Sequence, residues 1–526
     1  MRHTILFLTS VLISNVFYAQ APDIEWQKTL GGSSTDWALS MKLTSDSGYI
    51  VAGYSKSNDG DVSGNHGNND IGDFWVVKLD TAGSIEWEKS LGGTLDDWAQ
   101  SIQQTSDGGY VVAGTTYSNN GDVTGNHGLQ DYWVVKLSSN GSIEWQKTLG
   151  GSSDDVASGI QQTFDGGYIV AGSTYSNDVD VTGNHGLQDY WVVKLGSTGD
   201  IEWQKTLGGT DYEVSQSIQQ TADSGYIVVG ISTSLNGDVT GNHGNGDMWV
   251  VKLGNEGGIQ WQKTFGGQGA EGAYSIQQTS DGGYIVAGYS GMKDGDVTQW
   301  FGIWDYWVVK INNNGTIEWQ KSFGGTNNEE VYSIRQTSDD GYIVAGISSS
   351  NNGNVTGNHG NDDSWVIKLS STGNLQWQKS LGGTDYDDTK SILQTLDGGY
   401  ILAGGTRSTD GDVSGSHGWA DYWLVKLAPD GFTGVEHLSQ GEYLKMAPNP
   451  VKDKLYINYK LNGINNKLSL TVFNIQGQMV LHNRVLLSGE SLNVSALPAG
   501  IYWLQAEGTE SKKVYVQKIV ITGVHF

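Results

Sequence analysis

The chain of 526 residues contains no cysteine, only five prolines and few basic residues. Without cysteine, disulfide scaffolds, thiolate zinc sites and cysteine nucleophiles are excluded. The 30 Lys and Arg residues are outnumbered by 57 Asp and Glu residues, which gives a formal net charge of −27. Because binding to phosphates requires a basic surface, this balance argues against nucleic acid or an anionic membrane as a partner.

Long apolar runs are scarce as well, and no stretch of the mature chain approaches the ~20 apolar residues that a transmembrane helix needs. The most apolar segment near the start, residues 5–16, follows Arg2 and His3 and precedes Ala19. A charged start, a short apolar core and a small residue before the cut are typical of a signal peptide. We therefore predict a signal peptide over residues 1–19, export of the chain, and no transmembrane helix in the mature protein.

Glycine is abundant, with 76 residues, and much of it belongs to an internal repeat. Each copy of the string IEWQKTLGG is followed by segments similar to SIQQTSDGGYIVAG, SNDGDVTGNHG and DYWVVKL. A period this regular indicates one supersecondary unit copied seven times. The copies begin at residues 24, 85, 143, 201, 259, 317 and 375, so the first spacing is 61 residues and the others are 58.

Each unit contains four short runs of β-branched and aromatic residues, for example residues 101–105, 110–113, 132–137 and 143–147. Their Gly- and Asn-containing connections favour hairpins, because these residues adopt positive φ at low cost. Four antiparallel strands per unit predict a propeller blade, since a β-helix has a shorter period and no hairpins. The predicted fold is all-β, with a seven-bladed β-propeller over residues 20–430 whose strands run from hub to rim in chain order.

The two ends of the repeat array complement each other. The mature chain begins with an outer strand, residues 24–28, that has no partner strands before it, and the seventh unit ends at residue 427 without an outer strand. Pairing residues 24–28 with residues 422–427 would complete the last blade and remove two exposed sheet edges. We expect this pairing to join the two ends of the propeller.

A second domain begins near Met446, where the Gly-Gly motifs stop. Residues 446–526 hold eight Lys or Arg and four Asp or Glu, a net charge of +4 in an otherwise acidic chain. Five β-rich runs predict a small Ig-like antiparallel sandwich, joined to the propeller by a linker over residues 431–445. The runs are residues 454–461, 468–473, 478–486, 501–506 and 513–521.

Four segments of this domain, APNPVKDKLYI, LTVFNIQGQMV, LPAGIYWLQ and KKVYVQKIVI, occur in this order. They resemble the type A C-terminal sorting domain of type IX secretion cargo. The resemblance implies the type IX secretion machinery as a partner, passage across both membranes, and release or anchoring at the cell surface. The extra residues TGVHF at the end depart from the family pattern, and an accessory Ig-like module is the alternative. The family's recurrent residues fall on Pro448, Asn449, Pro450, Gly500, Tyr502 and Lys518.

The repeats themselves resemble DGGYIVAG arrays found on such secreted cargo. This likeness implies a propeller at the cell surface and no established activity. Kelch repeats are a weaker match, because Gly404 and Gly405 fit the kelch double glycine whereas most units have one glycine there.

Two sets of acidic residues recur in the loops that we expect on one face of the propeller. One acid stands four residues after each Gly-Gly pair, and the other set lies in the polar loop between the second and third strands. We therefore expect one strongly acidic face. The first set is Asp36, Asp97, Asp155, Glu213, Glu271, Glu329 and Asp387, and the second is Asp61, Asp122, Asp180, Asp238, Asp296, Asn354 and Asp412.

The polar loop offers hard oxygen ligands at close spacing, which suits calcium. The alternative is a turn in which the Asp and Asn side chains cap nearby backbone groups. The loop lacks the residue order of an EF-hand, so calcium stays a hypothesis and no other cofactor is indicated. The candidate ligands are Asp59, Asp61, Asp178, Asp180, Asp294, Asp296, Asp410 and Asp412.

Six of the ten histidines occupy one position of the repeat, near an Asp that stands two residues before a Trp. Histidines on six blades can share one zinc ion, at bonds of about 2.1 Å, only if all line the axis. We interpret the His, Asp and Trp of each unit as a hydrogen-bonded brace within the blade. The histidines are His66, His127, His185, His243, His359 and His417.

The repeat is broken in the fifth unit, where the usual Gly-Asn-His-Gly is replaced by residues 299–302. The surplus aromatic residues are Trp300, Phe301 and Trp304, which we predict to form a platform for sugar rings or a protein partner. Local repacking of a diverged loop is the alternative. Further aromatic residues, Trp37, Trp98 and Trp419, are expected near the same face.

The sequence contains no serine-hydrolase, zinc-protease or P-loop motif. Our hypothesis is a secreted or cell-surface, monomeric binding or adhesion module for glycan or protein. One alternative is a secreted polysaccharide lyase or hydrolase that uses unpaired acids on the acidic face. The other alternative is a display scaffold with no specific ligand.

Overall fold

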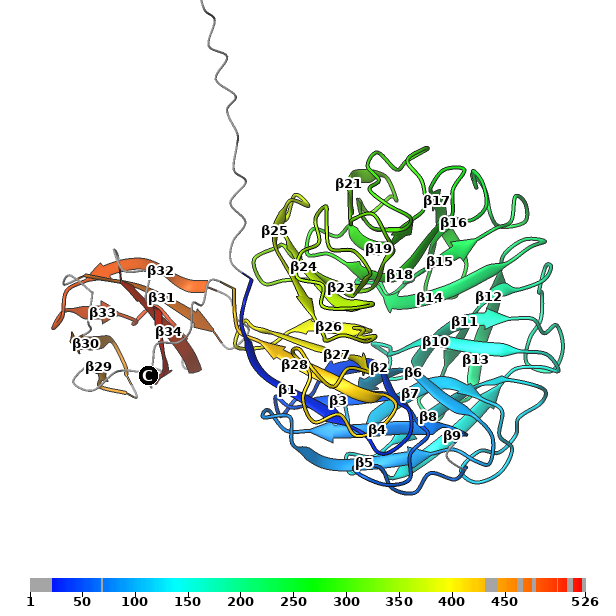
Figure 1. The fold of residues 1–526 in the computed structure, drawn as a ribbon, viewed down its shortest axis with the longest axis horizontal. Coiled ribbons are helices and arrows are strands. Elements are labelled where there is room, and N and C mark those ends of the chain that lie inside the picture. The colour runs from blue at the N-terminus through cyan, green and yellow to red at the C-terminus, as the bar shows by residue number, and fades with distance from the viewer. Residues whose placement is uncertain are drawn as a thin grey trace, which may run out of the picture.

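The computed structural model describes residues 21–67, 70–430, 443–449, 451–460, 467–474, 479–498, 500–508 and 514–522. The predicted signal peptide, most of the predicted linker and Pro450 lie outside these residues. Within them, the regular structure is β-strand. Between residues 24 and 427 the strands form seven four-stranded antiparallel sheets around a common centre, a propeller-like arrangement (Figure 1).

Sheets one to four each use four strands that follow one another in the chain. Sheet one contains β2 (Asp36–Leu43), β3 (Tyr49–Ser55), β4 (Asp73–Leu79) and β5 (Ile85–Leu91), and sheet two contains β6 (Asp97–Gln104), β7 (Tyr110–Thr116), β8 (Asp131–Leu137) and β9 (Ile143–Leu149). Sheet three contains β10 (Asp155–Gln162), β11 (Tyr168–Thr174), β12 (Asp189–Leu195) and β13 (Ile201–Leu207). Sheet four contains β14 (Glu213–Gln220), β15 (Tyr226–Ser232), β16 (Asp247–Leu253) and β17 (Ile259–Phe265).

Sheets five and six repeat this order, whereas sheet seven takes its outer strand from the other end of the chain. Sheet five contains β18 (Glu271–Gln278), β19 (Tyr284–Ser290), β20 (Asp305–Ile311) and β21 (Ile317–Phe323). Sheet six contains β22 (Glu329–Gln336), β23 (Tyr342–Ser348), β24 (Asp363–Leu369) and β25 (Leu375–Leu381). Sheet seven contains β26 (Ser391–Gln394), β27 (Tyr400–Thr406), β28 (Asp421–Leu427) and β1 (Ile24–Leu30).

Burial changes from strand to strand within each sheet in the way that the sequence predicts. In sheet two, every residue of the second strand β7 and the third strand β8 is buried, whereas the outer strand β9 is partly exposed along most of its length. The inner strand β6 starts at Asp97, four residues before the predicted start, and carries a β-bulge between Ala99 and Ser101. The inner strands face the centre, and those of sheets one to six carry the recurrent acid as their first residue, whereas in sheet seven Asp387 lies before β26.

One aromatic contact joins neighbouring sheets. The ring of Tyr132 packs on Trp191 with centroids 4.6 Å apart, and its hydroxyl donates to the backbone oxygen of Trp191 at 3.0 Å. The same contact joins sheet seven to sheet one, where the hydroxyl of Tyr422 donates to the backbone oxygen of Trp75 at 2.8 Å. Sheet seven thus packs against sheet one through the same contact that joins sheet two to sheet three.

Strand β1 pairs antiparallel with β28, from Ile24 opposite Leu427 to Leu30 opposite Tyr422. This is the pairing that the repeat arithmetic predicts. A side-chain bond reinforces it, because the indole of Trp423 donates to Oε1 of Gln27 at 3.0 Å. The first strand in the chain therefore occupies the outer position of the last sheet.

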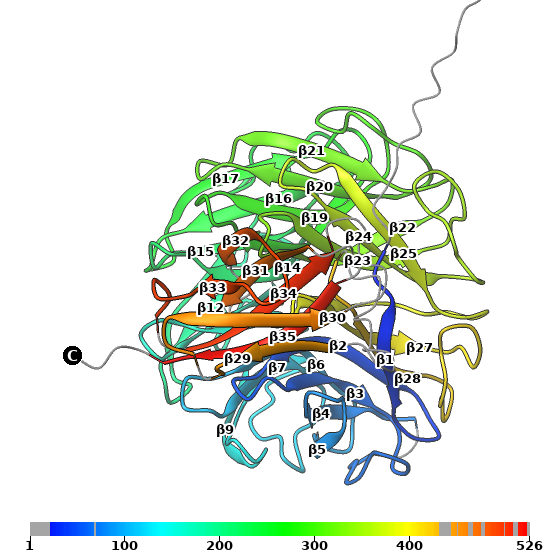
Figure 2. The same cartoon turned by 90° about the vertical axis from the view of Figure 1, so that its left-hand side faces the viewer.

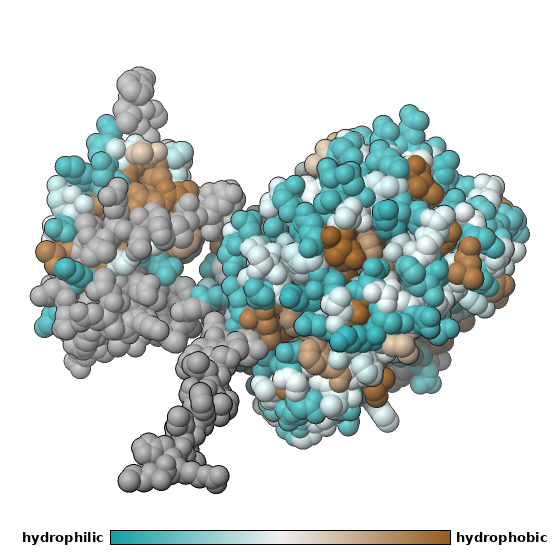
Figure 3. Space-filling model, turned by 90° about the horizontal axis from the view of Figure 1, so that it is seen from above, coloured by the Kyte–Doolittle hydropathy of each residue, from teal (hydrophilic) through white to brown (hydrophobic). Residues whose placement is uncertain are grey.

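The face of the propeller-like sheets that Figure 3 shows is largely hydrophilic. In the view of Figure 3, the hydrophobic residues lie in small, separate groups on the sheets rather than in one continuous area. Within the part of the chain that the structure describes, no helix is long and apolar enough to cross a membrane.

The C-terminal segment forms two antiparallel sheets with a common apolar core that includes Leu455, Leu470 and Leu504 (Figure 2). Five of its strands match the predicted runs to within two residues at each end, and β29 and β33 were not predicted. One sheet contains β29 (Tyr443–Ala447), β30 (Lys454–Lys460) and β33 (Ser491–Asn493). The other contains β32 (Met479–Leu486), β31 (Leu468–Asn474), β34 (Gly500–Gly508) and β35 (Val514–Ile521).

Candidate functional site

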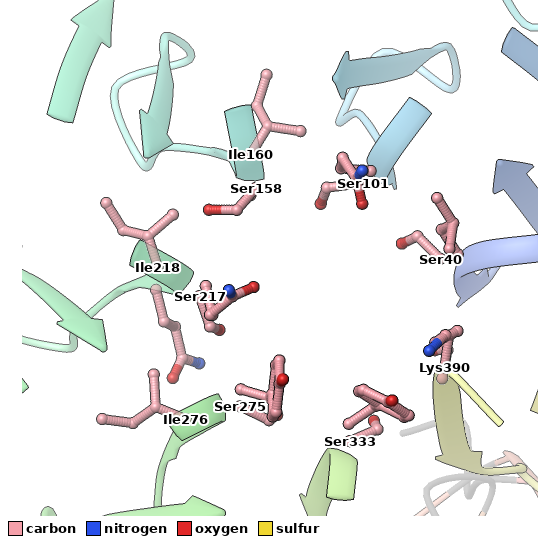
Figure 4. Close-up of a pocket in the computed structure, with 18 of the residues that line it drawn as sticks. Ser40, Ser101, Ser158, Ile160, Ser217, Ile218, Ser275, Ile276, Ser333 and Lys390 are labelled. Atoms are coloured by element: carbon pink, nitrogen blue, oxygen red, sulfur yellow. The ribbon is translucent and has the colours of Figure 1, made fainter. Parts of the chain in front are cut away.

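The seven inner strands surround a cavity of about 260 Å³ at the centre of the sheets. Figure 4 shows serines from six sheets, together with Lys390 of the seventh, arranged around its open centre. Most of the lining is hydroxyl and amide, because the inner strands carry Ser and Gln where they face the cavity. The labelled serines are Ser40, Ser101, Ser158, Ser217, Ser275 and Ser333.

A row of glutamines lies along one register of the inner strands. Oε1 of Gln103 accepts a hydrogen bond from the backbone N–H of Gln162 in the next sheet at 2.8 Å. Gln161, Gln219 and Gln277 each accept the same bond from their own neighbouring sheet, at 2.6 to 2.7 Å. These side chains join adjacent inner strands where no backbone ladder runs between sheets. Each Oε1 is therefore already occupied by a hydrogen bond to the next sheet.

The row is broken in three sheets. Lys42 of sheet one, Arg335 of sheet six and Leu393 of sheet seven occupy the position that glutamine holds elsewhere. The guanidinium of Arg335 donates to Ile334 O at 2.7 Å and to Ser275 Oγ at 3.2 Å. Burial, with a smaller contribution from the charge of Arg335, lowers the pKa of Lys42 to about 7. Among the described residues, neither cation forms an ion pair with a carboxylate.

Aromatic side chains form a continuous row from the diverged loop of sheet five to this cavity. Trp304 stacks on Tyr289 at 5.0 Å between centroids, Tyr289 lies 5.9 Å from Tyr274, and Tyr274 lies 5.1 Å from Tyr332. The ammonium of Lys390 lies 3.4 Å from the ring centroid of Tyr332. Tyr274 and Tyr332 line the cavity, and every ring of the row keeps part of its surface exposed. We call Trp304, Tyr289, Tyr274 and Tyr332 the aromatic row.

The three residues of the predicted platform take different positions. Trp304 joins the aromatic row, whereas Trp300 and Phe301 remain 43% and 42% exposed and contact no other aromatic ring of the described chain. Sequence reasoning missed Tyr274, Tyr332 and Lys390. The sequence does single them out, because they replace the polar residues that units two to four have at the same repeat position. Those residues are Gln100, Ser158 and Gln216.

A second group of side chains lies beside Lys390, where sheet seven meets sheet one. The buried carboxylate of Asp388 accepts from the indole of Trp37 at 3.1 Å and lies 3.1 Å from the ammonium of Lys390. It also accepts from the backbone N–H of Gly405 at 2.7 Å. These bonds replace part of the regular ladder, and β26 has only four residues where the other inner strands have eight.

Gly405 is needed because the indole of Trp37 occupies the space beside it. A Cβ atom at Gly405 would lie 2.3 Å from Cε2 of Trp37. We expect Gly405→Ala to lower the free energy of unfolding by about 1 to 3 kcal/mol, as measured by urea denaturation. Gly258→Ala is the matched control, because its Cβ would meet no atom within 4 Å. Equal stability of the two variants would contradict this account of the junction.

The prediction that the acids after the Gly-Gly pairs form an exposed acidic face is wrong. All seven are fully buried; six begin an inner strand, and Asp387 stands four residues before β26. Asp97 shows why: its carboxylate accepts from the backbone N–H of Gly93 at 2.8 Å, from Ser118 Oγ at 3.0 Å and from the hydroxyl of Thr116. The acids therefore hold the turn that enters each inner strand.

Each buried acid also lies near the Asp that begins the third strand of the preceding sheet. Burial, together with the nearby Asp73, raises the pKa of Asp97 to about 6. One oxygen of Asp73 makes no hydrogen bond within the described residues, and its six counterparts in the other sheets share this feature. The seven sheets therefore contain seven pairs of close, buried carboxyl groups. The pairs are Asp73 with Asp97, Asp131 with Asp155, Asp189 with Glu213, Asp247 with Glu271, Asp305 with Glu329, Asp363 with Asp387, and Asp421 with Asp36.

The predicted brace is correct for His and Asp in five of the six units that carry the histidine, and wrong for Trp; Nδ1 of His417 lies 3.8 Å from Asp421. Nδ1 of His66 lies 2.6 Å from Oδ2 of Asp73, and four other units repeat this hydrogen bond. The indole of Trp133, however, donates to Oε1 of Gln146 on the outer strand at 2.8 Å, not to the Asp. The histidines are thus held within their own sheets.

The candidate calcium ligands cap a backbone turn. Oδ1 of Asp59 accepts from the N–H of Ser33 at 2.7 Å, and Oδ2 of Asp61 accepts from the N–H of Gly31 at 3.3 Å. In the described residues, no three His, Asp or Glu side chains come together in a way that could hold a metal ion. The capping alternative accounts for these contacts, and calcium stays a prediction. The equivalent bonds are made by Asp178, Asp180, Asp294, Asp296, Asp410 and Asp412.

The residues of the predicted sorting motif lie at the start and in the second sheet of the C-terminal segment. Oδ1 of Asn449 accepts from the N–H of Val520 at 2.8 Å, next to Pro448. The hydroxyl of Tyr502 donates to Pro498 O at 2.8 Å, two residues after Gly500, the first residue of β34. Lys518 lies on β35 opposite Trp503, and Pro450 is outside the described residues.

A family model of the secretion system C-terminal sorting domain matches residues 445–522. These residues are a type IX secretion sorting domain. The sorting domain directs export of the chain to the cell surface or to the medium, as the resemblance of its four segments implied. It starts within one residue of the predicted boundary at residue 446.

No curated protein matches the sequence of the chain. Among solved structures, a fungal alcohol oxidase of the AA5 family, in complex with copper, is 11% identical with a TM-score of 0.43, covering 96% of this chain and all of that one. Sqt1 from Chaetomium thermophilum is 11% identical with a TM-score of 0.38, covering 76% of this chain and 99% of that one. PorZ, a surface component of the type IX secretion system of Porphyromonas gingivalis, is 12% identical with a TM-score of 0.30, covering 91% and 69%.

Proposed function

We propose that the mature chain is an exported, monomeric seven-bladed β-propeller followed by a cleavable sorting domain. Residues 1–19 are the signal peptide, residues 20–430 the propeller, residues 431–445 the linker and residues 446–526 the sorting domain. The pairing of β1 with β28, and the packing of Tyr422 on Trp75, support a propeller closed by its first strand. The match to the sorting domain supports its place outside the cell.

We infer that the propeller is a binding or adhesion module for glycan. The observation that carries this inference is the aromatic row, which runs from Trp304 to the central cavity. Aromatic rings stack on the apolar faces of sugar rings, and the serine and glutamine lining can bond to sugar hydroxyl groups. A protein partner fits less well, because the lining of the cavity is polar and its volume is small.

A polysaccharide lyase or hydrolase is less well supported. That alternative depended on exposed acids in the loops of one face, and the seven acids after the Gly-Gly pairs are buried and hydrogen-bonded. A display scaffold without a ligand is the remaining alternative. It predicts that no glycan binds in any condition.

A glycan array, scored with calcium and with a chelator, separates the three functions. We expect binding without shortening of the glycan, and Trp304→Ala should weaken it by about two- to tenfold, because an aromatic contact of this kind contributes about 0.5 to 1.5 kcal/mol. The matched control is Trp419→Ala, whose side chain is 80% exposed on another sheet. Unchanged affinity in Trp304→Ala would contradict the role of the aromatic row, shortened glycans would indicate the enzyme, and no binding would indicate the scaffold.

A further inference from the structure

The central cavity carries an unbalanced positive charge in a strongly acidic protein. Lys42 and Arg335 lie close enough that the charge of Arg335 lowers the pKa of Lys42, and both line the cavity. The third cation of the lining, Lys390, is paired with Asp388 at 3.1 Å. Two like charges that are half-buried without a counter-ion disfavour each other, and an anion between them removes this cost.

The other side chains of the same register present donors. Oε1 of Gln103, Gln161, Gln219 and Gln277 is already used by a backbone N–H of the next sheet. Their Nε2 groups make no hydrogen bond within the described residues, and the four glutamines line the cavity. With the ammonium of Lys42 and the guanidinium of Arg335, six of seven positions thus offer N–H groups. A set made only of donors suits an acceptor group such as a carboxylate.

The neighbouring register adds features that fit a sugar. Serine hydroxyls surround the cavity in six sheets, and Tyr274 and Tyr332 bring the aromatic row to its wall. The volume of about 260 Å³ lies just below the range of pockets for drug-sized ligands, so it suits one terminal residue of a chain rather than a longer segment. An acidic peptide would use the cations but leave the hydroxyl and tyrosine lining without a role.

We propose that the central cavity binds the carboxylate-bearing terminal sugar of an acidic glycan, with its carboxylate between Lys42 and Arg335. This proposal rests on the proposed function and deepens it. The amide N–H groups of the glutamine row and the serine hydroxyls bond to the remaining oxygens of the sugar. The aromatic row then carries the next part of the chain outward toward Trp304.

The test compares a galacturonate oligomer with the same oligomer methyl-esterified at its carboxylates, by isothermal titration calorimetry. We expect the acidic oligomer to bind at least about tenfold more tightly than the ester, because hydrogen bonds to charged groups are the stronger class. The variant Lys42→Gln/Arg335→Gln restores the glutamine of the other units and should remove this difference. Lys205→Gln/Lys263→Gln is the control, since it changes the net charge equally on exposed outer strands.

The outcomes separate this proposal from the proposed function. Equal affinity for acid and ester in the unaltered protein would overturn the acidic-sugar proposal and leave glycan binding intact, whereas no binding of either would overturn both. An unchanged preference in the double variant would also overturn it. Inorganic sulfate, or a Glu-rich peptide, that binds as tightly as the acidic oligomer would overturn the assignment to a sugar.

A pH series gives a second readout that needs only the folded, unaltered protein and Lys42→Gln. The other charged and titratable groups around this part of the cavity are Tyr274 from β18, Tyr332 and Arg335 from β22, and Lys390 before β26 with its partner Asp388. Because the pKa of Lys42 is about 7, its charge is lost as the pH rises above 7. Affinity for the acidic oligomer should therefore fall between pH 7 and 9, by up to about tenfold, and should stay flat in Lys42→Gln. A flat profile in the unaltered protein would contradict the role of Lys42.

Discussion

Removing residues 1–30 should lower the free energy of unfolding of the mature protein by about 3 to 6 kcal/mol relative to a chain that starts at residue 20. Strand β1 covers the outer edge of β28, and Leu30 is buried against sheet one. Burying a large aliphatic or aromatic side chain contributes about 1.5 to 3 kcal/mol, and β1 also places Ile24 and Trp26 against the core. Its loss exposes these contacts and leaves β28 as an open sheet edge.

Urea denaturation followed by tryptophan fluorescence measures this effect. The control is a chain that starts at Asp23, which keeps β1 and should keep the stability of the mature protein. A peptide of residues 21–32, added to the shortened protein, should restore part of the lost stability because it can pair with β28. If the chain without β1 unfolds at the same urea concentration as the mature protein, the closing role of this strand is wrong.

Stability should rise as the pH is lowered from 7 to 5, by at least about 3 kcal/mol in the free energy of unfolding. Burial is the main cause that raises the pKa of Asp97, Asp155 and Asp363 to about 6, and of Glu271 and Asp305 to about 7. The ordinary values of these groups are near 4, so the folded state holds more protons than the unfolded state between pH 4 and 7. Stability from these groups is present below pH 4 and is lost as the pH rises through 6 to 7.

Other groups set the lower limit of this window. Hydrogen bonds and the ammonium of Lys78 lower the pKa of Asp46 to about 2, and Asp107, Asp165 and Asp281 behave alike. Their contribution is lost as the pH falls from 4 toward 2. The lowered pKa of Lys42 makes stability depend on pH only above pH 7. We therefore expect maximum stability near pH 5.

Asp305→Asn tests the cause of this pH dependence. Asp305 has no histidine partner, and its carboxyl accepts from the N–H of Phe301 at 2.6 Å, a bond that an amide oxygen can replace. The variant should be more stable than the unaltered protein at pH 8 and similar at pH 5. Asp59→Asn is the control on the surface. If Asp305→Asn is less stable at pH 8, the buried carboxyl pairs are not the source of the effect. Thermal melts at both pH values give the comparison.

The repeat predicted much of the fold, because its apolar runs are separated by turn residues at a fixed spacing. The third strand was expected over residues 132–137 and is Asp131–Leu137. The inner strand was placed too late, at residue 101, because the polar residues before it looked like loop. In the structure Asp97 is a buried strand residue whose carboxyl group is hydrogen-bonded to backbone and hydroxyl donors. A sequence pattern does not show that a carboxylate will find such partners.

The site was harder to predict than the sheets, since a repeat hides the positions that face the centre. Trp304 was found because it interrupts a polar loop. Lys42 and Arg335 replace glutamine in a run that reads as an ordinary strand, and their meaning depends on which side chains meet across the axis. That juxtaposition comes from the packing of sheets that are far apart in the chain.

The contact of Tyr422 with Trp75 joins the beginning and the end of the array in the same way that Tyr132 joins Trp191. The joint between first and last sheets therefore has no weaker chemistry than an internal joint. The packing of the sheets therefore does not depend on which sheet contains the two ends of the chain. A circular permutant that links residue 430 to residue 21 by a short peptide, and opens in a surface turn between two sheets, should retain the contact of Tyr422 with Trp75 and the hydrogen bonds of Asp430 with Trp377 and Tyr400.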